Sequence, residues 1–153
     1  FMNTDFGVPG LLLVSEAGDR SLFSSTPVQG FTQIRAIHTL ANGDLIASDF
    51  GGDRIFLVDQ WTDERTLISG DIRGTGQEFD GPVATLELDS DTLATAQFQT
   101  SPGIFFIDKA SGDRTFLTGP GDTGRGTGPM LAARGFILDP NDSNRILATS
   151  FNL

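Results

Sequence analysis

The chain has 153 residues, with 20 Asp or Glu against 10 Lys or Arg, so its formal net charge is −10. This acidic balance excludes a basic surface for nucleic-acid phosphates, and the absence of Cys excludes disulfides, thiolate zinc sites and Cys nucleophiles. No apolar run approaches the roughly 18 residues of a membrane-spanning helix.

The chain begins with short apolar runs that are typical of β-strands. A first run, Met2–Phe6, ends in Phe, and two further runs of strand length follow it at Gly10–Ser15 and Arg20–Phe23. Apolar and β-branched residues bounded by Gly, Asp and Asn predict strands rather than helices. No stretch keeps a helical period over a useful length.

The middle of the chain predicts four consecutive strands. They are Ile34–Ala41, Leu45–Phe50, Arg54–Asp59 and Arg65–Ser69. Asn42-Gly43 lies between the first two, and this dipeptide favours a type I′ hairpin turn. The segment therefore predicts an antiparallel sheet in which each strand is joined to the next by a short turn.

The same four-strand pattern returns in the second half of the chain. The predicted strands are Val83–Leu88, Thr92–Phe98, Gly103–Ile107 and Arg114–Thr118, and then Gly135–Leu138 and Arg145–Phe151. The last two correspond only to the first two strands of the pattern. Single-domain size and this order predict one domain, with repeats at approximately 1–26, 30–70, 82–119 and 133–153.

Three separate features keep one order and nearly one period. The phenylalanines that close the second strand of each copy are 44, 48 and 53 residues apart, and the arginines that open the fourth strand are 45 and 49 apart. The apolar third strands are 44 and 49 residues apart. A period of about 40–50 residues with four strands predicts the blades of a β-propeller, and a sandwich of four-stranded units is the alternative.

The predicted strands of all copies add up to about three blades, whereas closed propellers have about 4–8. Two interpretations follow: the chain is part of a longer one, or two copies complete a six-bladed ring and cover each other's open strand edges. A first residue, Phe1, that lies within a predicted strand favours the partial chain.

Two stretches resemble the NHL-type repeat of bacterial propellers. Residues 42–59 have a turn, a strand ending in Ala-Ser-Asp, a short Gly loop, and then Arg-Ile and an apolar strand ending in Asp. The Gly-rich linker at 124–129 and the strand at 134–139 are similar to the corresponding parts of the same propellers. The resemblance implies a six-bladed ring that acts as a binding scaffold. Relatives of similar shape include gluconolactonase-type hydrolases, which use a divalent metal at the central channel.

Polar residues close the second strand of each copy. They are Asp5, Asp49, Gln97 and Ser150. In a propeller they would share one rim, where their oxygens could bind Ca²⁺ or a sugar. The alternative is that their side chains cap turns through hydrogen bonds to the backbone.

Arginines open the first strand in two copies, at Arg35 and Arg134, and Val83 takes this position in the third. The first strand is innermost in a propeller, so this pair would attract a carboxylate or phosphate near the channel. Salt bridges to the Asp-rich loops are the alternative. Gluconolactonase-like proteins tend to carry a metal-binding Asn here, and a guanidinium cannot ligate a cation, which argues against a metallohydrolase.

The other candidates point to structural roles. Arg20, Arg65 and Arg114 open the outer strands and are expected in solvent or in ion pairs. His38 is the single histidine, so a pair of histidines or a His-based metal cluster is excluded within this chain. Trp61 is either a stacking platform for a ligand or a cap on a sheet edge.

Two loop motifs are weak. The run at 119–124 fits G-x-G-x-x-G but has no helix after it. The oxygen-rich loop at 139–144 lacks the Gly and Glu of a calcium loop, so a plain hairpin is expected, although 141–143 matches a glycosylation sequon.

The sequence therefore favours a non-catalytic scaffold that binds a protein or carbohydrate partner outside the cytoplasm, extracellular or periplasmic. No cofactor is expected, with Ca²⁺ as the alternative. A metal-dependent hydrolase or lyase of the lactonase-like type, and a structural repeat that assembles through blade edges, are the other hypotheses.

Overall fold

The structure of the chain is a computed structural model that describes residues 2–3, 10–24, 30–99, 102–119 and 133–150. In these ranges the regular structure is β-strand except for a single 3₁₀ turn at Phe50–Gly52, which confirms the prediction of an all-β chain. No helix of the described residues has the length and hydrophobicity needed to cross a membrane.

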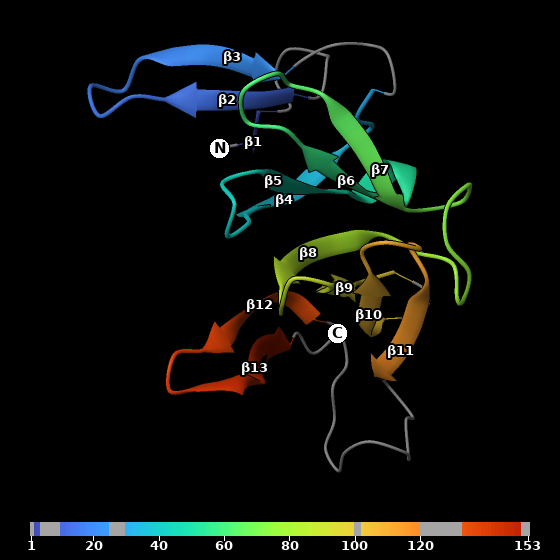
Figure 1. Cartoon of the computed structure of the whole chain (residues 1–153). Coiled ribbons are helices and arrows are strands. Elements are labelled where there is room, and N and C mark those ends of the chain that lie inside the picture. Colours follow the sequence, from blue (N-terminus) through green and yellow to red (C-terminus); the bar gives the residue numbers. More distant parts are fainter. Residues whose placement is uncertain (1, 4–9, 25–29, 100–101, 120–132, 151–153) are drawn as a thin grey trace.

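The described residues form thirteen strands in four antiparallel sheets (Figure 1). Within each sheet, strands that follow one another in sequence lie side by side, because the short turns between them allow only adjacent antiparallel pairing. The first sheet contains β1 (Met2–Asn3), β2 (Gly10–Val14) and β3 (Arg20–Ser24). The second contains β4 (Ile34–Thr39), β5 (Leu45–Asp49), β6 (Arg54–Val58) and β7 (Arg65–Ser69). The third contains β8 (Pro82–Glu87), β9 (Thr92–Gln97), β10 (Gly103–Asp108) and β11 (Arg114–Thr118). The fourth contains β12 (Ala133–Asp139) and β13 (Asp142–Ser150).

The two predicted outer strands, Arg65–Ser69 and Arg114–Thr118, match β7 and β11 at both ends. The other predicted strand ends that fall on described residues from Gly10 onward lie within three residues of the observed ones. Most of Met2–Phe6, including Asp5, lies outside the described residues, as do Phe151 and most of the Gly-rich run at 119–129.

The Asn42-Gly43 turn occurs where it was predicted, but its predicted type was wrong. A type I′ turn needs positive φ at both central residues, and only Gly43 of the pair has it, at 95°. The amide of Leu40 donates to the carbonyl of Asp44, and that of Gly43 donates to the carbonyl of Leu40. The hairpin therefore has a three-residue loop that ends in a left-handed Gly, which relieves the backbone strain at that position.

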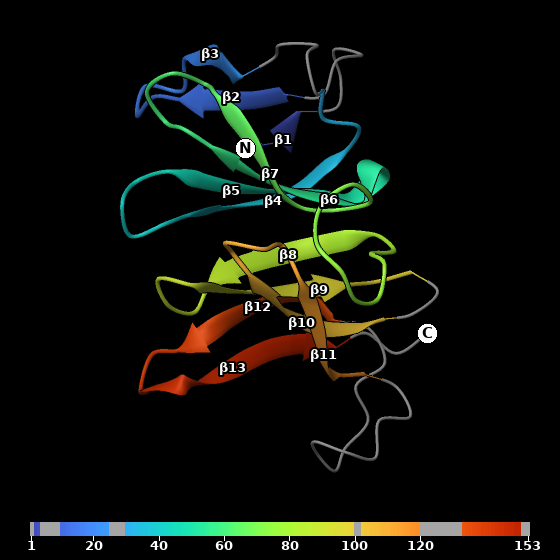
Figure 2. The same ribbon diagram turned by 45° about the vertical axis from the view of Figure 1, so that its right-hand side comes forward.

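The sheets lie one above another, and their first strands β4, β8 and β12 are neighbours (Figures 1 and 2). Hydrophobic side chains fill the spaces between sheets. Between the two four-stranded sheets the buried cluster consists of Leu40, Ile46, Ile55, Ile68, Phe79, Leu93 and Ile107. The hydroxyls of Ser48 and Thr85 are hydrogen-bonded at 2.8 Å across the same interface. Neighbouring sheets therefore share a core, and the positions of their first strands are fixed relative to each other.

Arg114 is the main departure from the expected side-chain positions. Its side chain, expected in solvent or in an ion pair, is buried, because the linker after β7 folds back over it. Its guanidinium donates to the hydroxyl of Ser69 and to the carbonyls of Gly70, Arg73 and Gln77. Desolvation by burial lowers the pKa of Arg114, with Glu78 and Asp113 acting in the opposite direction. This arginine therefore binds one sheet to the linker that leads from its neighbour.

Candidate functional site

The first strands of three sheets carry the same irregularity. In β4, β8 and β12 one extra residue interrupts the pairing with the following strand, and these residues are Arg35, Val83 and Arg134. A bulge of this kind redirects the side chain of the extra residue. The two arginines predicted to open the first strands are thus presented by the same local geometry.

Arg35 and Arg134 line one hollow of about 340 Å³, together with Val83, Phe50 and Phe98. The guanidinium of Arg35 lies 4.7 Å from the centre of the Phe50 ring, and that of Arg134 lies 4.1 Å from the centre of the Phe98 ring. We call this site the arginine hollow. Both arginine side chains are exposed to solvent.

The geometry gives the arginine hollow a positive, preorganised character. A guanidinium over an aromatic face is held by the negative charge of the ring face, and an exposed guanidinium can still donate hydrogen bonds to an anion. Val83, at the bulge of β8 between β4 and β12, also lines the hollow and adds an apolar wall. The arrangement is suited to a carboxylate attached to an apolar group.

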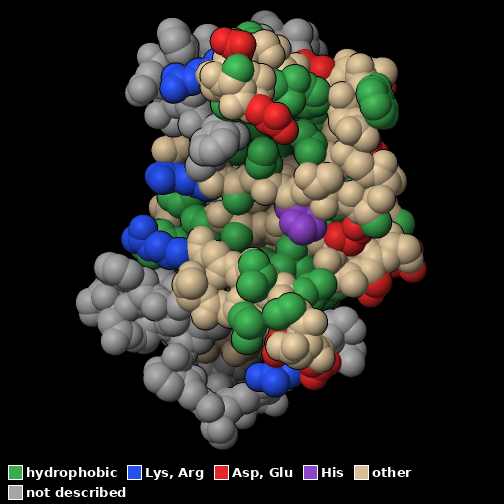
Figure 3. Space-filling model, turned by 90° about the vertical axis from the view of Figure 1, so that its left-hand side faces the viewer, with side chains coloured by type: hydrophobic (Ala, Val, Ile, Leu, Met, Phe, Trp, Pro, Cys, Tyr) green, Lys and Arg blue, Asp and Glu red, His purple; other side chains and the backbone are tan. Residues whose placement is uncertain are grey.

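The arginine hollow opens into a longer groove of about 440 Å³. The two share Arg35, Val83 and Arg134, and the groove continues along β4, β8 and β12 past Ile37 and Ile137 to His38 and Glu87. In the middle of this side of the molecule, basic side chains lie at the left, acidic ones at the right and hydrophobic ones between them (Figure 3). We call the groove along β4, β8 and β12 the first-strand groove.

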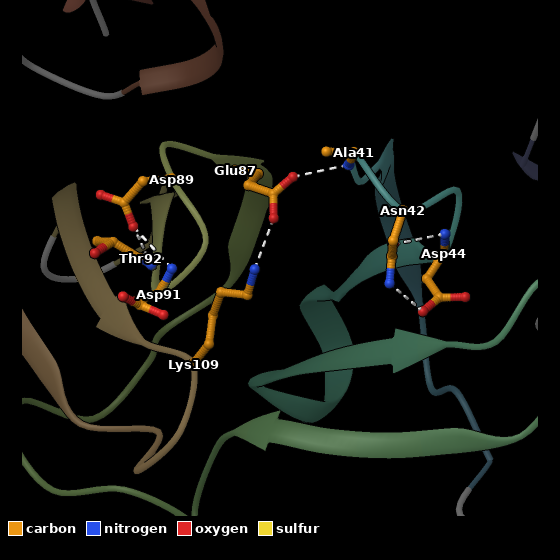
Figure 4. A network of polar contacts seen from close by, with 8 residues as sticks. All are labelled: Ala41, Asn42, Asp44, Glu87, Asp89, Asp91, Thr92 and Lys109. Atoms are coloured by element: carbon orange, nitrogen blue, oxygen red, sulfur yellow. Dashed lines mark hydrogen bonds and ion pairs between the residues drawn. The ribbon is translucent and has the colours of Figure 1, made fainter.

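Glu87 at the far end of the first-strand groove is held by two other elements (Figure 4). Its carboxylate accepts a hydrogen bond from Lys109 at 2.6 Å and another from the amide of Ala41 at 2.9 Å. Desolvation raises the pKa of Glu87, but these hydrogen bonds outweigh it, and the pKa lies below its ordinary value. Burial lowers the pKa of the adjacent His38, and the charge of Glu87 partly opposes this.

Asp49 and Gln97, predicted to lie on one rim, are both fully buried at the ends of β5 and β9. Asp49 accepts hydrogen bonds from the amides of Thr32 and Gln33 at 2.9 and 2.6 Å, and forms an ion pair with Arg54 at 2.8 Å. Gln97 accepts a hydrogen bond from the amide of Asp80. Both side chains accept hydrogen bonds from backbone amides of the segment just before the first strand of their sheet. Such contacts are those expected if the two side chains cap turns.

Of the remaining sequence candidates, the structure describes the side chain of Trp61, which does not line the arginine hollow. Trp61 is 84% exposed in the turn between β6 and β7, and its amide donates to Asp59. Asp5 lies outside the described residues, and of Ser150 only the backbone is described. The loop after Asp139 is the expected hairpin, with the amide of Asn141 donating to the Asp139 carboxylate.

Sequence reasoning found the two arginines but missed the aromatic half of the hollow. In the sequence pattern, Phe50 and Phe98 mark the period of the repeat. Both phenylalanines directly follow the polar residue that ends the second strand of their copy. Equivalent positions at the ends of equivalent strands lie at the same edge of the sheets, so this recurrence could have indicated that the two rings lie near the arginines.

Among the described residues, no three His, Cys, Asp or Glu side chains are grouped so that they could hold a metal ion. No protein-family model matches the sequence, and a comparison with curated proteins finds no match.

Proposed function

We propose that the chain is a segment of an NHL-like β-propeller that acts as a non-catalytic scaffold outside the cytoplasm and binds an acidic protein or carbohydrate partner in the arginine hollow. The repeated order of four antiparallel strands, with the first strands of successive sheets in contact, supports the propeller part of this proposal.

The observation that carries the binding function is the convergence of Arg35 and Arg134. They are almost one hundred residues apart in sequence and belong to different sheets, yet they line one hollow. Two guanidinium groups offer paired N–H donors, and a carboxylate accepts such pairs with the strongest class of hydrogen bond.

The scaffold supports binding because the arginines are presented by strands. Each lies at a bulge between strands whose pairing continues on both sides of it, and each stacks on a ring from a neighbouring strand end. Little side-chain freedom is then lost when a ligand binds, which favours affinity.

Isothermal titration with two probes tests this function: a short acidic peptide and an oligogalacturonate. We expect at least one probe to bind, and Arg35→Gln with Arg134→Gln to weaken it by at least about tenfold. Arg20→Gln is the matched control, because Arg20 is an exposed arginine of β3 outside the hollow. Absence of binding by both probes, or equal binding to the double variant, would contradict the proposal.

A further inference from the structure

Between the arginine hollow and its far end at His38 and Glu87, the first-strand groove carries exposed aliphatic side chains. Ile37 and Ile137 line it and are 41% and 61% exposed, and partly buried Phe136 lies beside Ile137 on β12. Large aliphatic side chains in water gain free energy when another apolar group covers them. A hydroxyl-rich sugar ring covers such a surface poorly, whereas a Leu, Ile or Val side chain covers it well.

The dimensions of the groove fit an extended chain. From Arg35 to His38 is three residues along β4, which is about 10 Å at the usual rise of a strand. An extended peptide has the same rise, so about four of its residues span this distance. A carboxylate at the arginine hollow then places a residue two positions away beside Ile37 and Ile137.

Charge favours one carboxylate over several. The protein has a net charge of −10, and the groove ends at Glu87. A polyanion would place additional negative charge along the groove toward Glu87, where like charges repel. A segment with a single carboxylate at the arginine end avoids this repulsion.

We propose, on the basis of the function proposed above, that the partner is a protein and that the first-strand groove binds an extended segment with one carboxylate and a large aliphatic side chain two residues away. The carboxylate binds Arg35 and Arg134, and the aliphatic side chain packs on Ile37 and Ile137. A Glu or Asp side chain and a C-terminal carboxylate share this chemistry.

Titration with capped tetrapeptides tests the proposal on the full chain. The reference probe is acetyl-Glu-Ser-Leu-Ser-amide; one comparison probe has Gln for Glu and another has Ser for Leu. We expect each replacement to weaken binding by at least about fivefold. A fourth probe, acetyl-Leu-Ser-Val with a free C-terminal carboxylate, distinguishes the two sources of the carboxylate, and either source supports the proposal if binding requires Arg35.

Ile137→Ser provides the matching change on the protein. This substitution should weaken binding of the reference probe. Binding of the probe with Ser in place of Leu should not change, because that probe has no aliphatic side chain that contacts Ile137. Leu13→Ser is the control, since Leu13 is a comparably exposed aliphatic residue on β2. Equal binding of the reference probe to Ile137→Ser would overturn the proposal.

The two proposals fail in different ways. Arginine-dependent binding of the oligogalacturonate without binding of any tetrapeptide would refute the peptide groove and keep the scaffold function. Failure of every probe would refute both.

Discussion

At the scale of single residues, Asp49 connects three segments through one buried carboxylate. We expect Asp49→Asn to lower the free energy of unfolding by about 3 kcal/mol, because an amide replaces one acceptor and leaves the mostly buried Arg54 without its counter-ion. Urea unfolding followed by far-UV circular dichroism measures this loss.

Asp89→Asn is the control for Asp49→Asn. Asp89 also accepts two backbone hydrogen bonds, both at 2.8 Å, from Asp91 and Thr92, but it lies in an exposed turn. Water can replace those contacts, so its loss of stability should be clearly smaller. Equal losses in the two variants would show that burial of the Asp49 ion pair contributes nothing.

The ion pair between Lys109 and Glu87 predicts that part of the free energy of unfolding depends on pH. Desolvation raises the pKa of Glu87, but the hydrogen bonds from Lys109 and Ala41 outweigh it, so its folded pKa lies below 4.5. A depressed carboxyl pKa stabilises the folded state above the unfolded pKa, and this stabilisation is lost as the pH falls through the folded pKa. Lys109→Met should therefore cost about 1 kcal/mol at pH 7.

The difference between the wild type and Lys109→Met should shrink as the pH falls from above 4.5 to below the folded pKa of Glu87. Urea unfolding of both proteins at several pH values measures this difference. Carboxyl groups away from Lys109 cancel in the comparison, whereas Asp89, whose pKa the charge of Lys109 also lowers, contributes in the same direction. A difference that stays constant with pH would contradict a charged Glu87 as the origin of the effect.

The candidate site was only half predictable from sequence. Arg35 and Arg134 could be placed because the repeat gives them equivalent strand positions. Arg114 was placed wrongly, because its burial depends on the path of the linker after β7, and that path has no strand pattern to predict it. Similarly, the exposure of Ile37 depends on neighbouring sheets and not on β4 alone.

At the scale of elements, the linker after β7 passes very close to the next sheet. Gly74 in this linker has φ of 82°, and a Cβ there would collide with the backbone carbonyl of Gly112. Gly18 in the β2–β3 turn has φ of 86° with nothing near its Cβ position. The two glycines therefore share a positive φ but differ in their surroundings.

We expect Gly18→Ala to cost about 1 kcal/mol, the penalty of a left-handed Ala. Gly74→Ala should cost more than about 3 kcal/mol, because the added methyl also forces the linker away from the turn at Gly112. Urea unfolding of the two variants gives the comparison. Equal costs would mean that the linker moves without loss, and the close approach would then have no structural role.

The strands themselves were largely predictable, because turn residues bound them and apolar residues fill them. The bulges were not, although they give Arg35, Val83 and Arg134 their common geometry. A bulge adds one residue to a strand without changing its composition, so it becomes visible only when the register with the partner strand is known.

At the scale of the whole molecule, the sheets form one continuous structure in which each interface has its own buried cluster. Leu11 and Phe31 belong to the cluster between the first two sheets, and Leu86 and Ala133 to the one between the last two. The first-strand groove depends on the clusters between the second, third and fourth sheets, because β4, β8 and β12 come from these three sheets. Binding in the groove should therefore stabilise the molecule as a whole.

The net charge of −10 opposes this compact arrangement through self-repulsion. Raising the salt concentration from about 0.01 M to about 0.1 M shortens the screening length from roughly 30 Å to roughly 10 Å. We therefore expect the urea midpoint to rise over this range, and to rise less in Asp71→Asn, which removes one exposed negative charge. NaCl and KCl should act alike, since the effect is one of screening. A midpoint that falls with salt would instead show that local ion pairs such as Arg54–Asp49 outweigh the long-range repulsion.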